Sequence, residues 1–284
     1  MYKKDWPING CRELLIKDGL PPLETNLLNS IRKDYFEQSQ KDCKTIDYED
    51  FTARVELAFQ NSHENVFVGL SSFPYKDVII GCQHYIDNLI SKGGLNNLQI
   101  FEHDYHYYKK LNPNIKYVTV DTLQTGKPLL IALPFPGHLG VHRQMDEILR
   151  ICNEKNIAVH LDCSWMSSAF DIKFNFDQPC IKTFAMSFSK AYALNWNKVG
   201  IRWSRDIDET DRITIMNKSN MISKSLLSIA EYYMDHLPVD YLCSTFKKEY
   251  FKICRELRLR PSNIIHACYS MDRKILYGLK NFFN

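Results

Sequence analysis

Apolar residues recur at two different spacings along this chain, and each spacing predicts a different kind of element. Residues Leu23 to Gln38 and Tyr48 to Gln60 carry apolar side chains every three to four positions, which predicts two amphipathic helices. Between about residues 65 and 205, short apolar runs alternate with helical stretches. The runs are Val66–Leu70, Leu98–Phe101, Tyr117–Val120, Leu129–Leu133, Ala158–Leu161, Phe184–Ser187 and Val199–Trp203. This alternation predicts an α/β protein with a mainly parallel central sheet.

The clearest helical pattern covers His142 to Lys155, where four apolar residues share one face. From Asp208 onward the pattern is mostly helical, with predicted helices over Ile222 to Met234 and Val239 to Leu257. A short apolar tail, Lys274 to Lys280, indicates a final strand. We therefore expect an N-terminal helical segment over residues 1–60, a large α/β domain over 61–205, and a reduced, mostly helical C-terminal domain over 206–284.

Composition narrows the class of protein. A chain of 284 residues with 45% apolar side chains can bury a substantial core. A net charge of +3 is too small to indicate nucleic acid or an anionic membrane surface as a partner. No stretch approaches the roughly 18 apolar residues that span a bilayer, and no apolar signal core follows the N-terminus. The nine cysteines are scattered without metal-ligand spacing, so we expect reduced thiols, no metal site and a cytoplasmic protein.

Chemistry-bearing residues follow two of the predicted strands. Asp162 ends one apolar run, and Ser187-Phe188-Ser189-Lys190 ends the next; Lys198 comes directly before Val199-Gly200. A single aspartate at a strand end is usually a turn former or a helix cap, so none of these residues is specific alone. Open α/β sheets bind ligands at the carboxyl ends of their strands, where these side chains are expected to meet.

The aspartate, the Ser-x-Ser-Lys segment and the following lysine, in this order along the chain, resemble the active-site core of fold-type-I enzymes that depend on pyridoxal 5′-phosphate (PLP). The resemblance is to class I/II aminotransferases in particular. The resemblance implies a PLP-dependent transferase fold of the aspartate aminotransferase type. Lys190 would form the Schiff base with the cofactor, and Asp162 would keep its ring nitrogen protonated. Ser187, Ser189 and Lys198 would bind its phosphate. Burial and a nearby cation would lower the pKa of Lys190 below the ordinary value of about 10.4.

The resemblance extends to other parts of the chain. Gly81, Cys82 and Gln83 match the family's turn and helix N-terminus, whose free N–H groups favour a phosphate. Tyr105 takes the position of the aromatic residue that stacks on the pyridine ring, although it can equally pack a helix against the sheet. Trp165 stands where aspartate-type aminotransferases carry a tyrosine.

Three departures bear on activity rather than on fold. The family usually has an Asn-Pro-x-Gly segment after this strand, whose asparagine binds the phenolic oxygen of the cofactor. This chain has Phe135-Pro136 there, without the asparagine. The usual phosphate-binding arginine is Lys198, which leaves Arg202 as an alternative phosphate ligand. The small domain normally carries an arginine that binds the substrate carboxylate. The candidates here are Arg258, Arg260 and Arg273.

These observations favour an aminotransferase-like PLP enzyme that acts on an amino acid or a related amine. The resemblance also implies a homodimer with shared active sites. Two alternatives stay open: a PLP-dependent lyase, decarboxylase or cyclase of a specialised pathway, and a non-catalytic protein that keeps the fold. Retention of both Lys190 and Asp162 argues against the non-catalytic alternative, because a buried lysine–aspartate pair is costly to maintain without a use.

Overall fold

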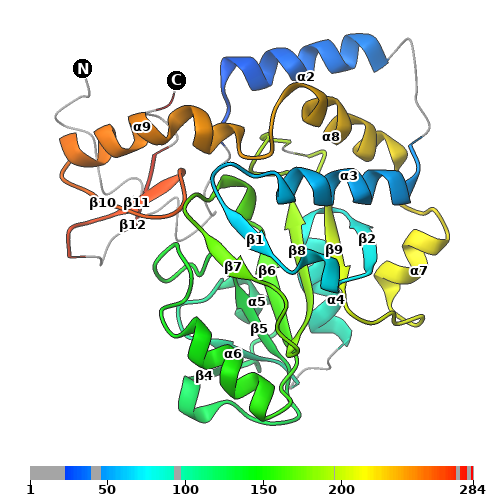
Figure 1. Cartoon of the computed structure of the whole chain (residues 1–284), viewed down its shortest axis with the longest axis vertical. Coiled ribbons are helices and arrows are strands. Elements are labelled where there is room, and N and C mark those ends of the chain that lie inside the picture. Colours follow the sequence, from blue (N-terminus) through cyan, green and yellow to red (C-terminus); the bar gives the residue numbers. More distant parts are fainter. Residues whose placement is uncertain are drawn as a thin grey trace.

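The computed structural model of the protein describes residues 23–39, 46–92, 97–194, 196–272, 276–279 and Phe283. Its centre is a seven-stranded sheet (Figure 1). The strand order is β2 (Tyr75–Ile79), β9 (Gly200–Ser204), β8 (Ile181–Ser187), β6 (Val159–Cys163), β5 (Leu129–Ala132), β3 (Gln99–Phe101) and β4 (Lys116–Val118). β9 runs antiparallel to both of its neighbours, and the remaining pairs are parallel. The predicted α/β architecture with a mainly parallel sheet is confirmed.

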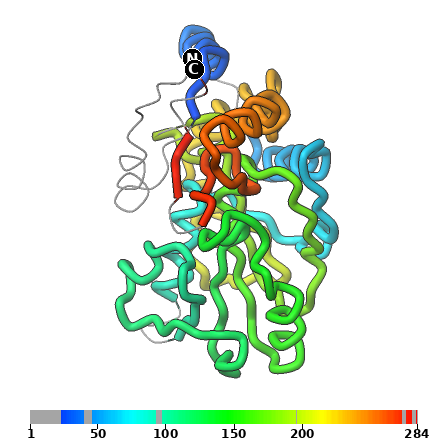
Figure 2. Tube along the Cα trace, turned by 90° about the vertical axis from the view of Figure 1, so that its left-hand side faces the viewer, coloured from blue at the N-terminus to red at the C-terminus, as the bar shows by residue number. Residues whose placement is uncertain are grey.

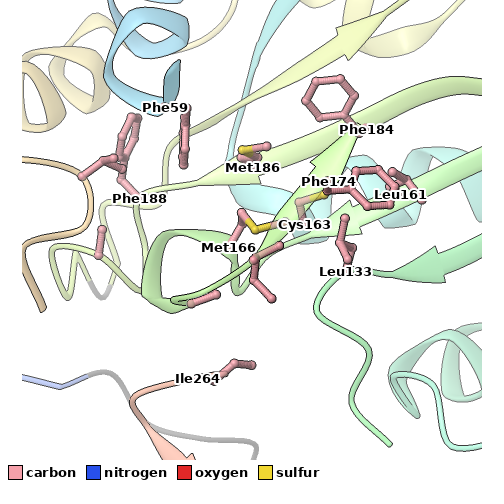
Figure 3. Packing of buried hydrophobic residues seen from close by; sticks show 14 of the residues in the cluster. Phe59, Leu133, Leu161, Cys163, Met166, Phe174, Phe184, Met186, Phe188 and Ile264 are labelled. Atoms are coloured by element: carbon pink, nitrogen blue, oxygen red, sulfur yellow. The ribbon is translucent and has the colours of Figure 1, made fainter. Parts of the chain in front are cut away.

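Both faces of the sheet are buried, which explains why its strands read as continuous apolar runs. On one face Leu130 and Ala185 pack with residues of α4 (Gly81–Lys92) and α5 (Tyr107–Leu111). On the other, Leu161 and Phe184 belong to a larger cluster that also includes residues of α3 (Tyr48–Gln60) and α6 (Met145–Glu154). Figure 3 shows part of this cluster, in which aromatic and sulfur-containing side chains interdigitate.

Most predicted helices form close to their expected bounds. α3 begins and ends at the predicted residues, and its N-cap Asp47 accepts a hydrogen bond from the backbone N–H of Glu49 at 2.8 Å. The other long helices are α2 (Asn26–Ser39), α8 (Lys224–His236) and α9 (Tyr241–Glu256). The run that starts at Val66 forms β1 (Val66–Val68), which pairs with β7 (Lys173–Asn175) in a separate two-stranded sheet rather than with the central strands.

The C-terminal part adds a small antiparallel sheet of β10 (Arg260–Pro261), β11 (Ala267–Tyr269) and β12 (Leu276–Gly278). β12 lies within the predicted final strand, whose ends Lys274 and Lys280 are outside the described residues. In Figure 2 this sheet lies directly above the green loops that leave the central sheet. Hydrogen bonds join the two, such as the one from Asn263 N to Leu139 O at 3.0 Å. No helix in the described part of the chain is long and apolar enough to cross a membrane.

A buried charge cluster ties β2, β9 and α7 (Arg212–Lys218) together at one edge of the central sheet. Arg202 on β9 is 5% exposed, and its Nη2 donates to Asp77 Oδ2 at 2.5 Å. Its Nη1 donates to Asp211 Oδ1 at 2.7 Å, and Thr214 accepts a further bond. The sequence-based alternative that Arg202 reaches a phosphate is therefore wrong, because its guanidinium is already bound by two carboxylates.

Replacing Arg202 should destabilise the fold strongly. Arg202→Ala leaves Asp77 and Asp211 buried without their counter-ion, so we expect a loss of about 3–5 kcal/mol in the free energy of unfolding. Urea denaturation measures this loss. The matched control is Arg150→Ala, which removes an exposed pair with Glu154 on α6 and should cost about 0.3–0.5 kcal/mol. Equal effects of the two substitutions would contradict the assigned role of the cluster.

Candidate active site

Two adjacent strands bring the polar residues together. β6 and β8 are parallel neighbours in which Asp162 pairs with Ala185 and Cys163 with Met186, so the residues that follow each strand leave the sheet at the same edge. A cavity of about 320 Å³ lies there. All ten residues that the sequence suggested line it: Gly81, Cys82, Gln83, Tyr105, Asp162, Trp165, Ser187, Ser189, Lys190 and Lys198. A larger cleft of about 590 Å³, between the loops after β3 and β5 and strand β10, contains none of them.

The Asp162 carboxylate is buried and held in a fixed orientation. Tyr108 donates its hydroxyl to Oδ2 at 2.7 Å, and Oδ1 accepts bonds from the backbone N–H of Ser164 at 3.0 Å and from its hydroxyl. Burial raises the pKa of Asp162, while these hydrogen bonds and the charge of Lys190 oppose that rise. Oδ1 already accepts two hydrogen bonds, whereas Oδ2 accepts one, so Oδ2 can accept a second bond from a protonated ring nitrogen.

Lys190 supplies a buried amine to the cavity. Burial, together with the positive charge of Lys198, lowers the pKa of Lys190 to about 8. Its Nζ lies 4.4 Å from the centre of the Trp165 ring. An amine with this pKa is neutral in about one molecule in ten at pH 7, far more often than an ordinary lysine, and the neutral form is the nucleophile.

A glycine allows the start of α4 to lie close to Ser189 and Lys198. Gly81 has φ +71°, and a Cβ there would lie 3.3 Å from Cβ of Lys198 and 3.8 Å from Oγ of Ser189. The backbone N–H groups at the start of a helix, a hydroxyl and an ammonium group suit a phosphate. Neighbouring Cys82 is buried and donates to the carbonyl of Ala185, and burial raises its pKa to about 12, so it remains a thiol.

The structure adds residues that the sequence reasoning missed. Tyr108 and Ser164 donate hydrogen bonds to Asp162. The sequence features that could have identified them are the tyrosine three positions after Tyr105 and the serine two positions after Asp162. At the end of β5 and in the turn that follows, Ala132 and Pro136 line the cavity. That strand therefore offers no side-chain hydrogen-bond donor to a ligand.

The sequence matches no protein-family model, and no curated protein matches it either. Solved structures do match. A PLP-bound putative aminotransferase from Clostridium difficile 630 has a TM-score of 0.64 at 12% identity, with 91% of this chain and 79% of that one covered. A PLP-bound C-S lyase from Staphylococcus hominis has a TM-score of 0.62 at 10% identity, with 87% and 73% covered. L-threonine-O-3-phosphate decarboxylase from Porphyromonas gingivalis has a TM-score of 0.57 at 13% identity, with 86% and 81% covered.

These similarities confirm the expected fold. The chain has the fold-type-I architecture of aspartate aminotransferase-like PLP enzymes over most of its length. At identities of 10–13% they say nothing about which reaction this chain performs.

The pKa of Lys190 can be measured without any cofactor. Because its neutral amine is the reactive form, the rate of acetylation by acetic anhydride should rise with pH and level off above about 8. Free N-acetyl-lysine, with a pKa of about 10.4, should continue to react faster up to about two pH units higher. Peptide mass spectrometry follows the labelling. Lys198→Gln should shift the profile of Lys190 upward, and a profile that levels off only near pH 10 in the unmodified protein would contradict the assignment.

Proposed function

We propose that this protein is a PLP-dependent enzyme of the aminotransferase type that acts on an amino acid or a related amine. The observation that carries the proposal is that Lys190 and Asp162 line one cavity together with Gly81, Ser189 and Lys198, whose donor groups suit a phosphate. Each of the three groups answers a separate requirement of the cofactor: an amine for its aldehyde, a carboxylate for its ring nitrogen and donors for its phosphate.

The residues would hold PLP as follows. The start of α4 at Gly81, Cys82 and Gln83, with Ser187, Ser189 and Lys198, would bind the phosphate. Tyr105 would stack on the ring, Trp165 would contact the cofactor as well, and Asp162 would bind the ring nitrogen. Lys190 would bind the aldehyde carbon through its amine. The cavity volume of about 320 Å³ is at the lower end of the range for small-molecule sites, as expected for a cofactor with a small substrate.

When bound, PLP withdraws electrons from the α-carbon of an amino substrate. The protein's part is to control protons. Asp162 would keep a proton on the ring nitrogen, helped by the hydrogen bonds from Tyr108 and Ser164 that fix its orientation. The amine of Lys190, once displaced by the substrate amine, would take a proton from the α-carbon and deliver it to C4′ of the cofactor.

A second reaction class has support of its own. Phe135 and Trp165 stand at the positions where aminotransferases of this type carry an asparagine and a tyrosine that bind the phenolic oxygen. A C-S lyase and a decarboxylase share the fold. A lyase, decarboxylase or cyclase is therefore the alternative, and product analysis separates it: an aminotransferase passes the amine to a keto acid, whereas these enzymes release another fragment or close a ring.

We also propose a homodimer whose partner subunit covers the cavity, in a cytoplasmic setting. Trp196, in the loop that joins Lys190 to Lys198, is 94% exposed, which is unusual for so large an apolar side chain. A second copy that covers this loop would bury it beside the site. The seven described cysteines are free thiols, in keeping with a reducing compartment.

Replacing Lys190 tests the attachment of the cofactor. After incubation with PLP and reduction by borohydride, mass spectrometry of the unmodified protein should find one adduct, on Lys190. Lys190→Ala should lose this adduct while circular dichroism shows an unchanged fold. The control Lys92→Ala, which alters an exposed lysine paired with Asp208, should retain it. An adduct that persists at another lysine in Lys190→Ala would refute the role given to Lys190.

Replacing Asp162 tests the role of the ring-nitrogen carboxylate. Asp162→Asn preserves the shape of the side chain but removes the charge that stabilises a protonated ring. We expect the Lys190 adduct to form as before, and the exchange of the α-proton of an amino substrate for deuterium to slow by roughly 100-fold or more. Proton NMR in deuterated water measures the exchange. Unchanged exchange would show that Asp162 has no such role.

A further inference from the structure

A buried alanine in the loop after Lys190 has a left-handed backbone. Ala193 has φ +49° and is fully buried. This conformation is uncommon for residues other than glycine, because Cβ comes too close to the following carbonyl oxygen, so the surrounding contacts must enforce it. After this turn the chain comes back to its starting point. Phe188 N donates to Val199 O at 3.1 Å, which returns Lys198 to the cavity that Lys190 lines.

A helix far away in the sequence supplies one of these contacts. Arg32 lies on α2, 161 positions before Ala193, and its Nη2 donates to the carbonyl oxygen of Ala193 at 2.5 Å. Among the described residues, this is the one hydrogen bond to the backbone of Ala193. A guanidinium donor forms a stronger bond to a carbonyl than a neutral N–H does. The bond therefore fixes the direction of this carbonyl, and with it the left-handed turn.

The helix that carries Arg32 is itself fixed against α8 (Figure 1). Tyr233 on α8 donates its hydroxyl to the carbonyl oxygen of Leu28 at 2.8 Å. Tyr35 on α2 donates its hydroxyl to the carbonyl oxygen of Ser225 at 3.4 Å. Because α2 is bound to the rest of the fold at these points, the guanidinium of Arg32 acts from a fixed support.

The loop that contains Ala193 positions both cations of the cavity, Lys190 and Lys198. A Cβ at Gly81 would lie 3.3 Å from Cβ of Lys198, so the stem of that lysine lies against the start of α4. Burial and the charge of Lys198 lower the pKa of Lys190. A relaxed turn at Ala193 would move Lys198 and expose Lys190, and each of these changes would raise the pKa of Lys190.

We propose that Arg32 is a positioning residue for the active site: by binding the carbonyl of Ala193, it keeps the loop in the shape that places Lys190 and Lys198 at the cavity. The inference rests on the proposed function, because these lysines are assigned there to the aldehyde and the phosphate of PLP. It gives the N-terminal helix α2 a part in a site that it does not line. A bond that only attached α2 to the fold would affect stability and leave the two lysines unchanged.

The pH profile of Lys190 separates these two roles without any cofactor. Arg32→Met keeps the length of the side chain but removes its donors. In the full-length, cofactor-free variant, acetylation of Lys190 by acetic anhydride should level off about one pH unit higher than in the unmodified protein, which corresponds to a tenfold smaller neutral fraction at a given pH. The control Tyr35→Phe removes the bond from α2 to Ser225 and should keep the original profile.

A second substitution tests whether Arg32 acts through Ala193. Glycine adopts a left-handed backbone without the cost of a Cβ, so Ala193→Gly should make the turn independent of the arginine. Arg32→Met combined with Ala193→Gly should therefore restore the profile of Lys190. The affinity for PLP, measured by absorbance, should follow the same order: about tenfold weaker in Arg32→Met and within about threefold of the unmodified protein in the double variant.

Three outcomes would overturn the proposal: an unchanged Lys190 profile in Arg32→Met, an equal shift in Tyr35→Phe, or no recovery in the double variant. Circular dichroism establishes that each variant is folded. Should Arg32→Met not fold, Arg32→Lys replaces it; this variant keeps the charge but loses the planar pair of donors, and should shift the profile in the same direction. Failure of the proposed function is distinguishable, because the unmodified protein would then form no borohydride-reduced adduct on Lys190, while the acetylation profiles still decide the role of Arg32.

Discussion

The parallel pairing of β6 with β8 is the constraint on which the rest of the site depends. The register that pairs Asp162 with Ala185 brings the end of β6 beside the end of β8, where the chain continues to Lys190. A shift of the register by one residue would turn each side chain of the shifted strand to the opposite face and would move the end of β8 along the sheet edge relative to Asp162. The apolar packing of the sheet therefore fixes the distance between the two charged groups.

Burial then sets the chemistry of those groups. It raises the pKa of Asp162 and lowers that of Lys190, because it disfavours the charged form of each group. Hydrogen bonds from Tyr108 and Ser164 favour the charged form of the aspartate, whereas Lys198 favours the neutral form of the lysine. The hydrogen bonds thus oppose the loss of charge on the aspartate while the neutral fraction of the lysine rises, and a carboxylate and a neutral amine are the two forms that PLP chemistry requires.

Much of this arrangement could be predicted from the sequence. Helices and strands show characteristic spacings of apolar residues, and the polar residues that follow the strands identify the site. The bounds of α3 and the ten cavity residues belong to this class. Pairing between distant segments leaves no local pattern in the sequence. β1 and β7, which form the separate sheet, lie more than 100 residues apart. The ion pairs of Arg202 likewise depend on how β2, β9 and the start of α7 pack together, because Asp77 and Asp211 lie on different elements.

A crystal structure of the protein grown with PLP tests the central claim most directly, because it locates every part of the cofactor at once. The account predicts electron density continuous from Lys190 Nζ into the cofactor. It also predicts a ring nitrogen within hydrogen-bonding distance of Asp162 and a phosphate enclosed by Gly81, Ser189 and Lys198. Density for PLP at any other place, or an empty cavity at saturating PLP with Lys190 and Asp162 positioned as described, would contradict it.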